Sequence, residues 1–183
     1  MKLNMSQAEF LNSLDEQKEI YDIYMPAIEL AGIDRKKLLA NKELHVSAMY
    51  LNHSKIDILL SRLLPENTKS KMGKFPNQLL QHLKLAVDIR NIKIHNGNVS
   101  YTEISNKTQK KASIYFENIN GSISNISNIP SSLKKDSICI AKLDCKFNKF
   151  TEVSTIFHLS LTDRLGAFSA NLKLEGLQSH QIS

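Results

Sequence analysis

Alternation of apolar and polar residues dominates the chain from residue 85 onward and predicts β-strands. In "NIKIHNGNVSYTEIS" (91–105), apolar side chains recur at every second position on both sides of an Asn-Gly pair. The runs "ASIYFENINGSISNIS", "SICIAKLDCKFNKF", "STIFHLSLTD" and "GAFSANLKLEGL" repeat the pattern. Such alternation, with a polar opposite face, indicates antiparallel strands packed on one side. The link at 162–167 predicts a hairpin between the last two strands. Gly97 and Gly121 each follow Asn, which is typical of turns.

The N-terminal half mixes strand-like and short helical patterns. Residues 43–60 form its longest strand-like run, and Pro26 marks the stretch 20–30 as an edge or bent strand. Asp34 and Pro76 stand where short helices would begin, over 34–42 and 76–84.

Three other segments have weaker signals. Residues 5–18 show a mild helical pattern behind a possible Ser6 N-cap, and residues 129–136 predict a helical turn. The stretch 61–75 is polar and basic and predicts an exposed, disordered loop.

Together these patterns predict a mostly β (α+β) fold. We expect a curved antiparallel sheet that forms a groove or half-barrel, with two or three short helices packed at its N-terminal part. No β-α-β alternation is visible, so a doubly wound sheet is not expected. The predicted organisation is an N-terminal helical segment (1–19), a single β-rich domain (20–178) and a short tail (179–183).

Composition narrows the functional classes only slightly. The chain has 183 residues, a net charge of +6 and 7% aromatic residues without Trp. The charge fits anionic lipid head groups or nucleic acid, and also an ordinary soluble surface. Because aromatic side chains are few, an OB-like nucleic-acid binder is disfavoured and no nucleic-acid partner is expected. No apolar run reaches the ~18 residues of a membrane span, and no secretory signal begins the sequence. A cytosolic protein and a soluble piece of a longer one both remain open.

Sequence motifs for catalysis or metal binding are missing. The histidines are not paired at ligand spacing, and neither a phosphate loop nor a nucleophile elbow occurs. Asp57 and Asp88 alternate with apolar residues, as on the solvated face of a strand. Cys139 and Cys145 would lie about 20 Å apart on one strand, too far for a disulfide. We therefore expect no enzyme, no metal and no cofactor.

Four phrases resemble, in order, those of the AsmA-like (TamB- and YhdP-related) family of bacterial envelope proteins. They are "YMPAIELAGIDRKKLLANKELHVSAMYLNHSKIDIL", "LLQHLKLAVDIRNIKIHNGNVSYTE", "ASIYFENINGSISNISN" and "FHLSLTDRLGAFSANLKLEGL". Each phrase is short, and the resemblance lies in their order over residues 20–178.

The resemblance implies a function in the bacterial envelope. It implies a non-enzymatic periplasmic segment of an inner-membrane-anchored protein, whose anchor is not in this sequence. Such a segment would line a hydrophobic groove for phospholipid transport between the inner and outer membranes and support outer-membrane biogenesis. The expected partners are a phospholipid or another acyl-chain ligand, and neighbouring β-segments of a longer parent chain.

The best candidates for the groove are the apolar positions of the alternating strands, and they are carried by no single family motif. These candidate groove residues are Ile92, Ile94, Ile114, Phe116, Cys139, Leu143, Cys145, Phe147, Phe157, Leu159, Leu161, Phe168, Leu172 and Leu174. A plain core would use the same positions. The alternative function is a β-rich protein-interaction or outer-membrane assembly module with no lipid ligand, which would use its edge strands for partners.

Overall fold

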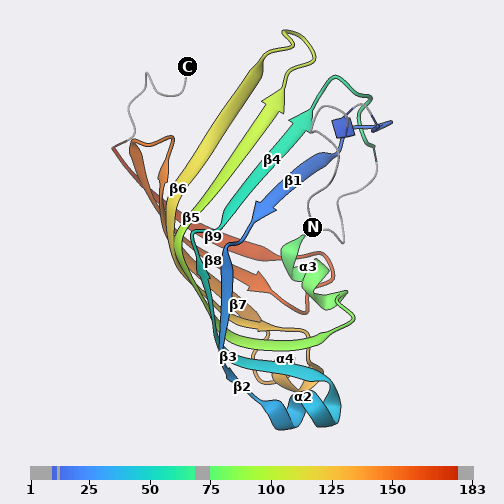
Figure 1. The fold of residues 1–183 in the computed structure, drawn as a ribbon, viewed down its shortest axis with the longest axis vertical. Coiled ribbons are helices and arrows are strands. Elements are labelled where there is room, and N and C mark those ends of the chain that lie inside the picture. Colours follow the sequence, from blue (N-terminus) through green and yellow to red (C-terminus); the bar gives the residue numbers. More distant parts are fainter. Residues whose placement is uncertain (1–9, 12, 69–74, 177–183) are drawn as a thin grey trace.

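The computed structural model describes residues 10–11, 13–68 and 75–176, and within them the chain forms one open sheet of nine strands (Figure 1). The strands are β1 (Glu19–Tyr24), β2 (Ala27–Ile33), β3 (Glu43–Asn52), β4 (Lys55–Ser61), β5 (Ala86–Ile104), β6 (Lys111–Ser127), β7 (Ile138–Phe147), β8 (Thr151–Ser160) and β9 (Phe168–Glu175). The mostly β prediction is confirmed, and the sheet does not close into a barrel.

Short helices connect some of the strands: α2 (Arg35–Asn41), α3 (Pro76–Gln81) and α4 (Pro130–Leu133). Asp34 caps α2, and its carboxylate accepts a hydrogen bond from the Lys37 backbone N–H at 3.1 Å. Pro76 occupies the first turn of α3, where its missing N–H costs nothing. The helix starts predicted at Asp34 and Pro76 are therefore confirmed, as is the helical turn within 129–136.

The sheet is mixed, so the expectation of a wholly antiparallel sheet is wrong in one place. Strands β3 and β4 both pair with β5 in parallel, whereas the other neighbours are antiparallel. Parallel pairing needs a long crossover, and the segment from Ser61 to Ala86, which contains α3, provides it. One β-α-β unit thus exists that the sequence patterns did not predict, although the sheet is not doubly wound.

The strand-like runs 20–30 and 43–60 each form two strands instead of one, and these strands pair with each other. Pro26 separates β1 from β2, and this broken pair forms one edge of the sheet, as expected for a strand with proline. His53 has a φ of 53° and separates β3 from β4, so the run 43–60 is two strands. Strand β9 forms the other edge.

The breaks line up across the sheet in a row that we call the upper crease: Met25–Pro26, His53–Ser54, Asn96–Gly97 and Asn118. His53, Asn96 and Asn118 all have φ near 50°. The register between β5 and β6 shifts around Gly97. The Asn96 N–H donates a hydrogen bond to the Asn120 Oδ1 at 3.1 Å. Figure 1 shows the sheet bending where β1 and β4 pass into β2 and β3. Gly97 and Gly121 therefore sit in irregular strand positions, and their prediction as turn residues is wrong.

A second row of irregular positions, the lower crease, contains Gly32, Ser47 and Asn125. Gly32 and Asn125 have φ of 68° and 59°. The β3–β5 register passes from Val46–Ile89 directly to Met49–Ile92. Both strands skip two positions there, so the register is unchanged while the side chains that follow change direction in both strands together.

The two creases explain how one face stays apolar although the sequence alternation changes phase twice. Along β5, the positions that face the same side are Val87 and Ile89, then Ile92 and Ile94, then Val99 and Tyr101. Strands β3 and β4 lie end to end beside β5, and each of their residues pairs with the residue 43 positions later, from Glu43–Ala86 to Ser61–Ile104. Their side chains therefore change direction at the same two places as those of β5. Neighbouring strands thus bend together and keep their apolar residues on one side.

Connections elsewhere agree with the sequence in part. The 162–167 link joins β8 to β9 as a hairpin, in which Asp163 Oδ1 accepts bonds from Leu165 and Ala167 N–H groups. Residues 62–68 form turns and loop, whereas 69–74, where disorder was predicted, lie outside the described residues.

The N-terminal helix predicted over 5–18 is only partly described. Phe10 and Leu11 are helical, and residues 1–9 and 12, with the Ser6 cap, lie outside the described residues. Residues 13–18 are not helical. Both the backbone and the side chain of Gln17 instead bond to the loop carbonyls of Pro65 and Leu64.

A carboxylate on β4 gives the fold a pH-dependent contribution. Asp57 lies 2.7 Å from Lys55 Nζ and accepts a hydrogen bond from Ser100 Oγ at 2.5 Å. Partial burial alone raises the pKa of Asp57, but the bonds from Lys55 and Ser100 outweigh it, so the pKa lies below its usual value.

Since the pKa is lower in the folded state, Asp57 stabilises the fold above pH 4 and loses this effect as the pH falls through the folded pKa. We expect Asp57→Asn to lower the free energy of unfolding by about 1 kcal/mol or less at pH 7. At a pH of about 2.5 the difference should shrink. Urea unfolding at both pH values checks this, and an equal loss at both would contradict it.

Candidate functional site

The candidate site is the face of the sheet that α3 covers, which we call the inner face. Strand register assigns side chains to it, because directly paired residues point to the same side. Three rows cross it: Leu30–Met49–Ile92–Ile123–Ala141–Phe157–Ala170, Ile28–Leu51–Ile94–Gly121–Leu143–Thr155–Leu172, and Ile23–Ile56–Val99–Phe116–Phe147–Thr151. Apolar residues thus run across the inner face from one edge of the sheet to the other.

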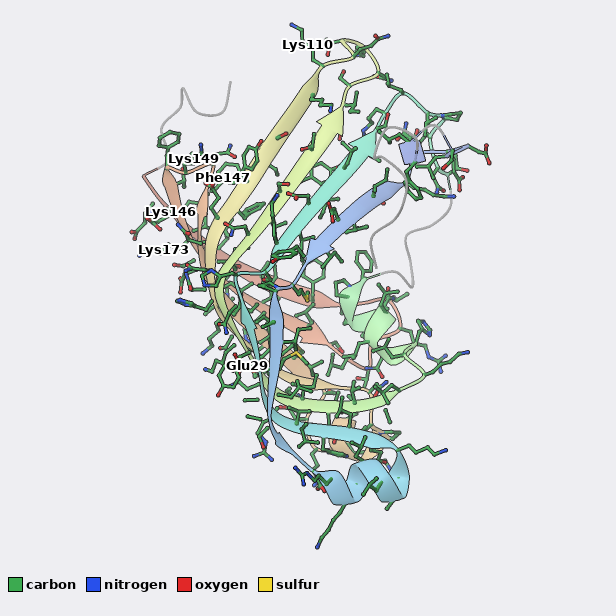
Figure 2. The ribbon with its side chains drawn as sticks, in the orientation of Figure 1. Glu29, Lys110, Lys146, Phe147, Lys149 and Lys173 are labelled. Carbon is green, nitrogen blue, oxygen red and sulfur yellow. The ribbon has the colours of Figure 1, made fainter. Side chains whose placement is uncertain are left out.

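The opposite, outer face carries charges. Lys146 pairs with Glu152 at 3.2 Å, and Lys173 pairs with Glu175. Figure 2 shows Lys146 and Lys173 on the side of the sheet away from α3. The outer face of β7, β8 and β9 is therefore suited to water.

The register places thirteen of the fourteen candidate groove residues on the inner face, and Leu161, which follows β8, lines the pocket on the same face; their surroundings differ. Cys139, Cys145 and Leu161 are buried. Partly buried are Ile92, Ile94, Phe116, Leu143, Phe147, Phe157 and Leu159. Exposed are Ile114 and, on the edge strand β9, Phe168, Leu172 and Leu174. Phe116 and Phe147 pack with ring centroids 5.4 Å apart. The register thus brings these residues together on one surface, and their contact with lipid stays a prediction.

A large part of the inner face has no protein cover within the described residues. Leu172 is 62% exposed at one edge of the sheet and Ile23 is 55% exposed at the other. Exposed apolar side chains are ordinary when scattered, but these belong to continuous rows. Continuous exposed apolar surface of this kind is uncommon on folded domains.

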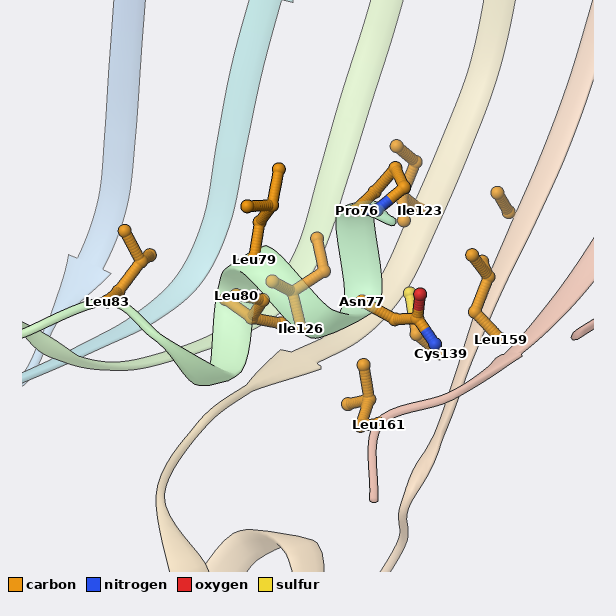
Figure 3. Close-up of a pocket in the computed structure, with 11 residues that line it drawn as sticks. Pro76, Asn77, Leu79, Leu80, Leu83, Ile123, Ile126, Cys139, Leu159 and Leu161 are labelled. Carbon is orange, nitrogen blue, oxygen red and sulfur yellow. The ribbon is translucent and has the colours of Figure 1, made fainter. Parts of the chain in front are cut away.

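A pocket of about 380 Å³ lies between α3 and the inner face (Figure 3). The sheet forms its floor and α3 its roof, and the lining is almost entirely apolar. The lining residues are Pro76, Asn77, Leu79, Leu80, Leu83, Ile123, Ile126, Cys139, Ala141, Leu159 and Leu161. Ligand pockets commonly have volumes of roughly 300–1,000 Å³, so this pocket is in the range of a small-molecule site.

Three of the fourteen candidates line the pocket: Cys139, Leu159 and Leu161. Sequence reasoning missed the roof, which Leu79, Leu80 and Leu83 form within the segment 76–84 that was predicted to be helical. It also missed Ala141, whose small side chain leaves room in the floor. The one available signal was the amphipathic helix before β5, which does not by itself say which face of the sheet it covers.

Amide side chains hold α3 at both ends. The Asn77 Nδ2 donates to the Ser160 carbonyl at 2.7 Å, and the Gln78 Nε2 donates to the Arg164 carbonyl at 2.8 Å. The Gln81 Nε2 donates to Ser127 at 3.0 Å. Asn77 and Gln78 are buried, where unpaired amides would be costly. The roof is therefore tied to the ends of β8 and β6 by polar bonds while the space beneath it stays apolar.

Asn128 fixes the C-terminal end of the roof. Its Oδ1 accepts a bond from the Val87 N–H at 2.7 Å, and its Nδ2 donates to the carbonyls of Leu80, Leu83 and Leu85 at 3.0–3.3 Å. Asn128 ends the phrase "NISN" within the third of the family-like stretches, so one residue of that phrase has a structural role here.

Two of the candidate groove residues, Cys139 and Cys145, carry ionisable side chains. Burial raises the pKa of the Cys139 thiol to about 11, so the thiol stays protonated at neutral pH. Burial also raises the pKa of Cys145, with the charges of Asp144 and Glu152 adding to it. Both cysteines are free and buried. Among the described residues, His, Cys, Asp and Glu form no group of three that could hold a metal ion.

No protein-family model matches this chain, and no curated protein matches it. The AsmA-like resemblance therefore stays an expectation from the order of its phrases. No helix within the described residues is long and apolar enough to cross a membrane.

Proposed function

We propose that this chain is a non-enzymatic lipid-handling segment of the AsmA-like type, whose inner face holds the acyl chains of phospholipid. The observation that carries the proposal is the continuous apolar inner face, exposed at both edges and only partly covered by α3. Strand β5 has 19 residues, so the face follows a path of about 60 Å along it.

Physical chemistry supports an acyl-chain ligand. Covering a few hundred Å² of apolar surface contributes roughly 25 cal/mol per Å², or several kcal/mol in total. This is enough for useful binding and weak enough for release. Charged side chains on the outer face contact water. Apolar side chains on the inner face are exposed, and an apolar ligand that covers them would remove their surface from water.

The family resemblance supplies the setting of the proposal. In that setting the segment belongs to an inner-membrane-anchored protein of the bacterial periplasm and helps to move phospholipid toward the outer membrane. Neighbouring β-segments of the same parent would pair with the edge strands β2 and β9, in which every residue is exposed.

The test is native mass spectrometry of the purified chain, with organic extraction of what it carries. We expect bound phospholipid, and we expect Phe157→Asp to reduce it by about tenfold, because a charge on the floor must be desolvated beneath an acyl chain. Ile156→Asp is the matched control, since Ile156 is the next residue of β8 and faces outward.

A protein that carries no lipid, and that takes none up from phospholipid vesicles, would contradict the proposal. Equal loss of lipid in Ile156→Asp would also count against it, because the effect would then come from a general loss of folding.

A second function is favoured by the exposed edges alone. An interaction or assembly module without a lipid ligand would use β9, whose residues are all exposed and which contains neither proline nor a bulge. Sedimentation of lipid-free protein distinguishes the two: concentration-dependent association that Leu172→Lys abolishes, in a protein that binds no lipid, would favour the module.

A further inference from the structure

We infer that the pocket beneath α3 takes the distal end of a single acyl chain and leaves the head group of that chain outside. The inference rests on the proposed function for the class of ligand, and it adds a site that the strand pattern alone did not contain. It follows from the lining, the volume and the fixed roof of the pocket.

The lining has no place for a charged or strongly polar group. Among its eleven residues, Asn77 alone has a polar side chain, and its Nδ2 is already bonded to the Ser160 carbonyl. An ionised phosphate or ammonium would lose its hydration there with no charged partner in the lining, at a large cost in free energy. The part of a lipid that enters must therefore be hydrocarbon.

The volume limits how much hydrocarbon enters. A methylene group fills roughly the share of volume of one water molecule in the liquid, about 30 Å³. The pocket of about 380 Å³ thus holds on the order of a dozen methylene groups. That corresponds in size to most of one acyl chain.

The roof keeps this volume from collapsing. Bonds from Asn77 and Gln78 tie the start of α3 to the end of β8 and the β8–β9 link, and Gln81 and Asn128 tie its end to β6. A helix held by its ends cannot sink onto the floor without breaking these bonds. A preformed apolar space of this kind gains free energy when hydrocarbon fills it.

The experiment measures binding of 1-alkanols from eight to sixteen carbons, delivered from cyclodextrin, to the full chain by calorimetry. Each added methylene should tighten binding by about fourfold until roughly twelve carbons, after which affinity levels off. Exchanging the hydroxyl for a carboxylate or a trimethylammonium group should change affinity by less than about threefold, because the head stays in water.

Matched variants locate the site. Ala141→Phe fills the floor of the pocket and should weaken dodecanol binding by at least about tenfold. Ile140→Phe adds a ring at the neighbouring position on the outer face and should leave binding unchanged. Affinity that keeps rising through sixteen carbons, or that follows the charge of the head group, overturns the inference.

A second measurement does not depend on whether Ala141→Phe folds. In a Cys145→Ser background, Cys139 is the remaining cysteine, and it lines the pocket. At pH 9, where more of the thiol is ionised than at neutral pH, dodecanol should slow the reaction of Cys139 with iodoacetamide by at least about fivefold, because the chain fills the pocket that the thiol lines. An unchanged rate at a saturating alkanol concentration overturns the inference.

The outcomes separate this inference from the proposed function. Phospholipid that co-purifies equally with the native chain and with folded Ala141→Phe overturns the single-chain pocket but leaves the groove. Alkanols that bind as expected to a chain that carries no phospholipid support the pocket and contradict the proposed transport function.

Discussion

Gly121→Ala is expected to destabilise the fold by about 4 kcal/mol, whereas Gly97→Ala should cost about 1 kcal/mol. Both glycines follow asparagine and both lie at irregular strand positions, so their sequence surroundings are alike. The expected effects differ because the space around each glycine differs.

The Gly121 position leaves no room for a methyl group. A Cβ there would lie 2.1 Å from the Lys142 backbone carbonyl oxygen, and φ is 148°, a conformation that other residues rarely adopt. The clash is with backbone on strand β7, so only a shift of the whole strand relieves it. At Gly97 the nearest atoms are side-chain atoms of Ile94 and Ser54, at 3.2 and 3.3 Å, and these can move.

Urea unfolding of both variants measures the difference, with each slope compared to that of the native chain. Gly97→Ala is the matched control for the loss of backbone freedom that any glycine replacement brings. Equal and small effects at the two sites would mean that β7 does not approach β6 as closely as the structure has it.

Asn128→Ala is expected to destabilise the fold by about 3 kcal/mol. The substitution removes an acceptor for the Val87 N–H and a donor shared by the carbonyls of Leu80, Leu83 and Leu85. Losing the partner of a buried polar group costs roughly 1–3 kcal/mol, and here the bonds to Val87 and Leu80 are partly buried while those to Leu83 and Leu85 are exposed. The roof of the pocket should also loosen, so the loss of dodecanol binding should accompany the loss of stability.

The measurement is again urea unfolding, and Asn171→Ala is the control. Asn171 is exposed on the edge strand β9, and the same substitution there should change stability by about 0.5 kcal/mol or less. A loss of similar size in both variants would contradict the role assigned to Asn128. Asn128→Asp tests the two kinds of hydrogen bond separately, because the aspartate keeps an oxygen that accepts from the Val87 N–H and loses the N–H₂ group that donates to the carbonyls.

Much of the fold follows from local patterns, and what was missed depends on distant contacts. The alternation through Cys139, Leu143 and Phe157 correctly predicted strands with one apolar face, and Asp34 and Pro76 correctly predicted two helix starts. The parallel pairing of β3 with β5 was missed, because alternation alone does not fix strand direction when one face is exposed. The Asn-Gly pairs were misread, since the same dipeptide suits a hairpin turn and a bulge.

The candidate site was predictable as a face and not as a pocket. Register is determined by which residues are apolar, so the strands could place Leu159 and Leu161 on a common surface from sequence. The pocket depends on how far α3 stands from that surface. This distance is set by Asn77, Gln78 and Asn128, whose partners lie more than forty residues away in the chain. Nothing local in the sequence distinguishes these amides from the many others on the surface.

The creases also determine where this chain can tolerate a change in length. Within a regular part of the sheet, successive side chains alternate between the two faces. Deleting one residue near Lys93 would therefore turn the following apolar residues toward water. Around Asn96 and Gly97 the register between β5 and β6 already shifts, and such an irregular position can absorb an odd residue. Insertions and deletions of single residues are therefore compatible with this fold chiefly at the creases.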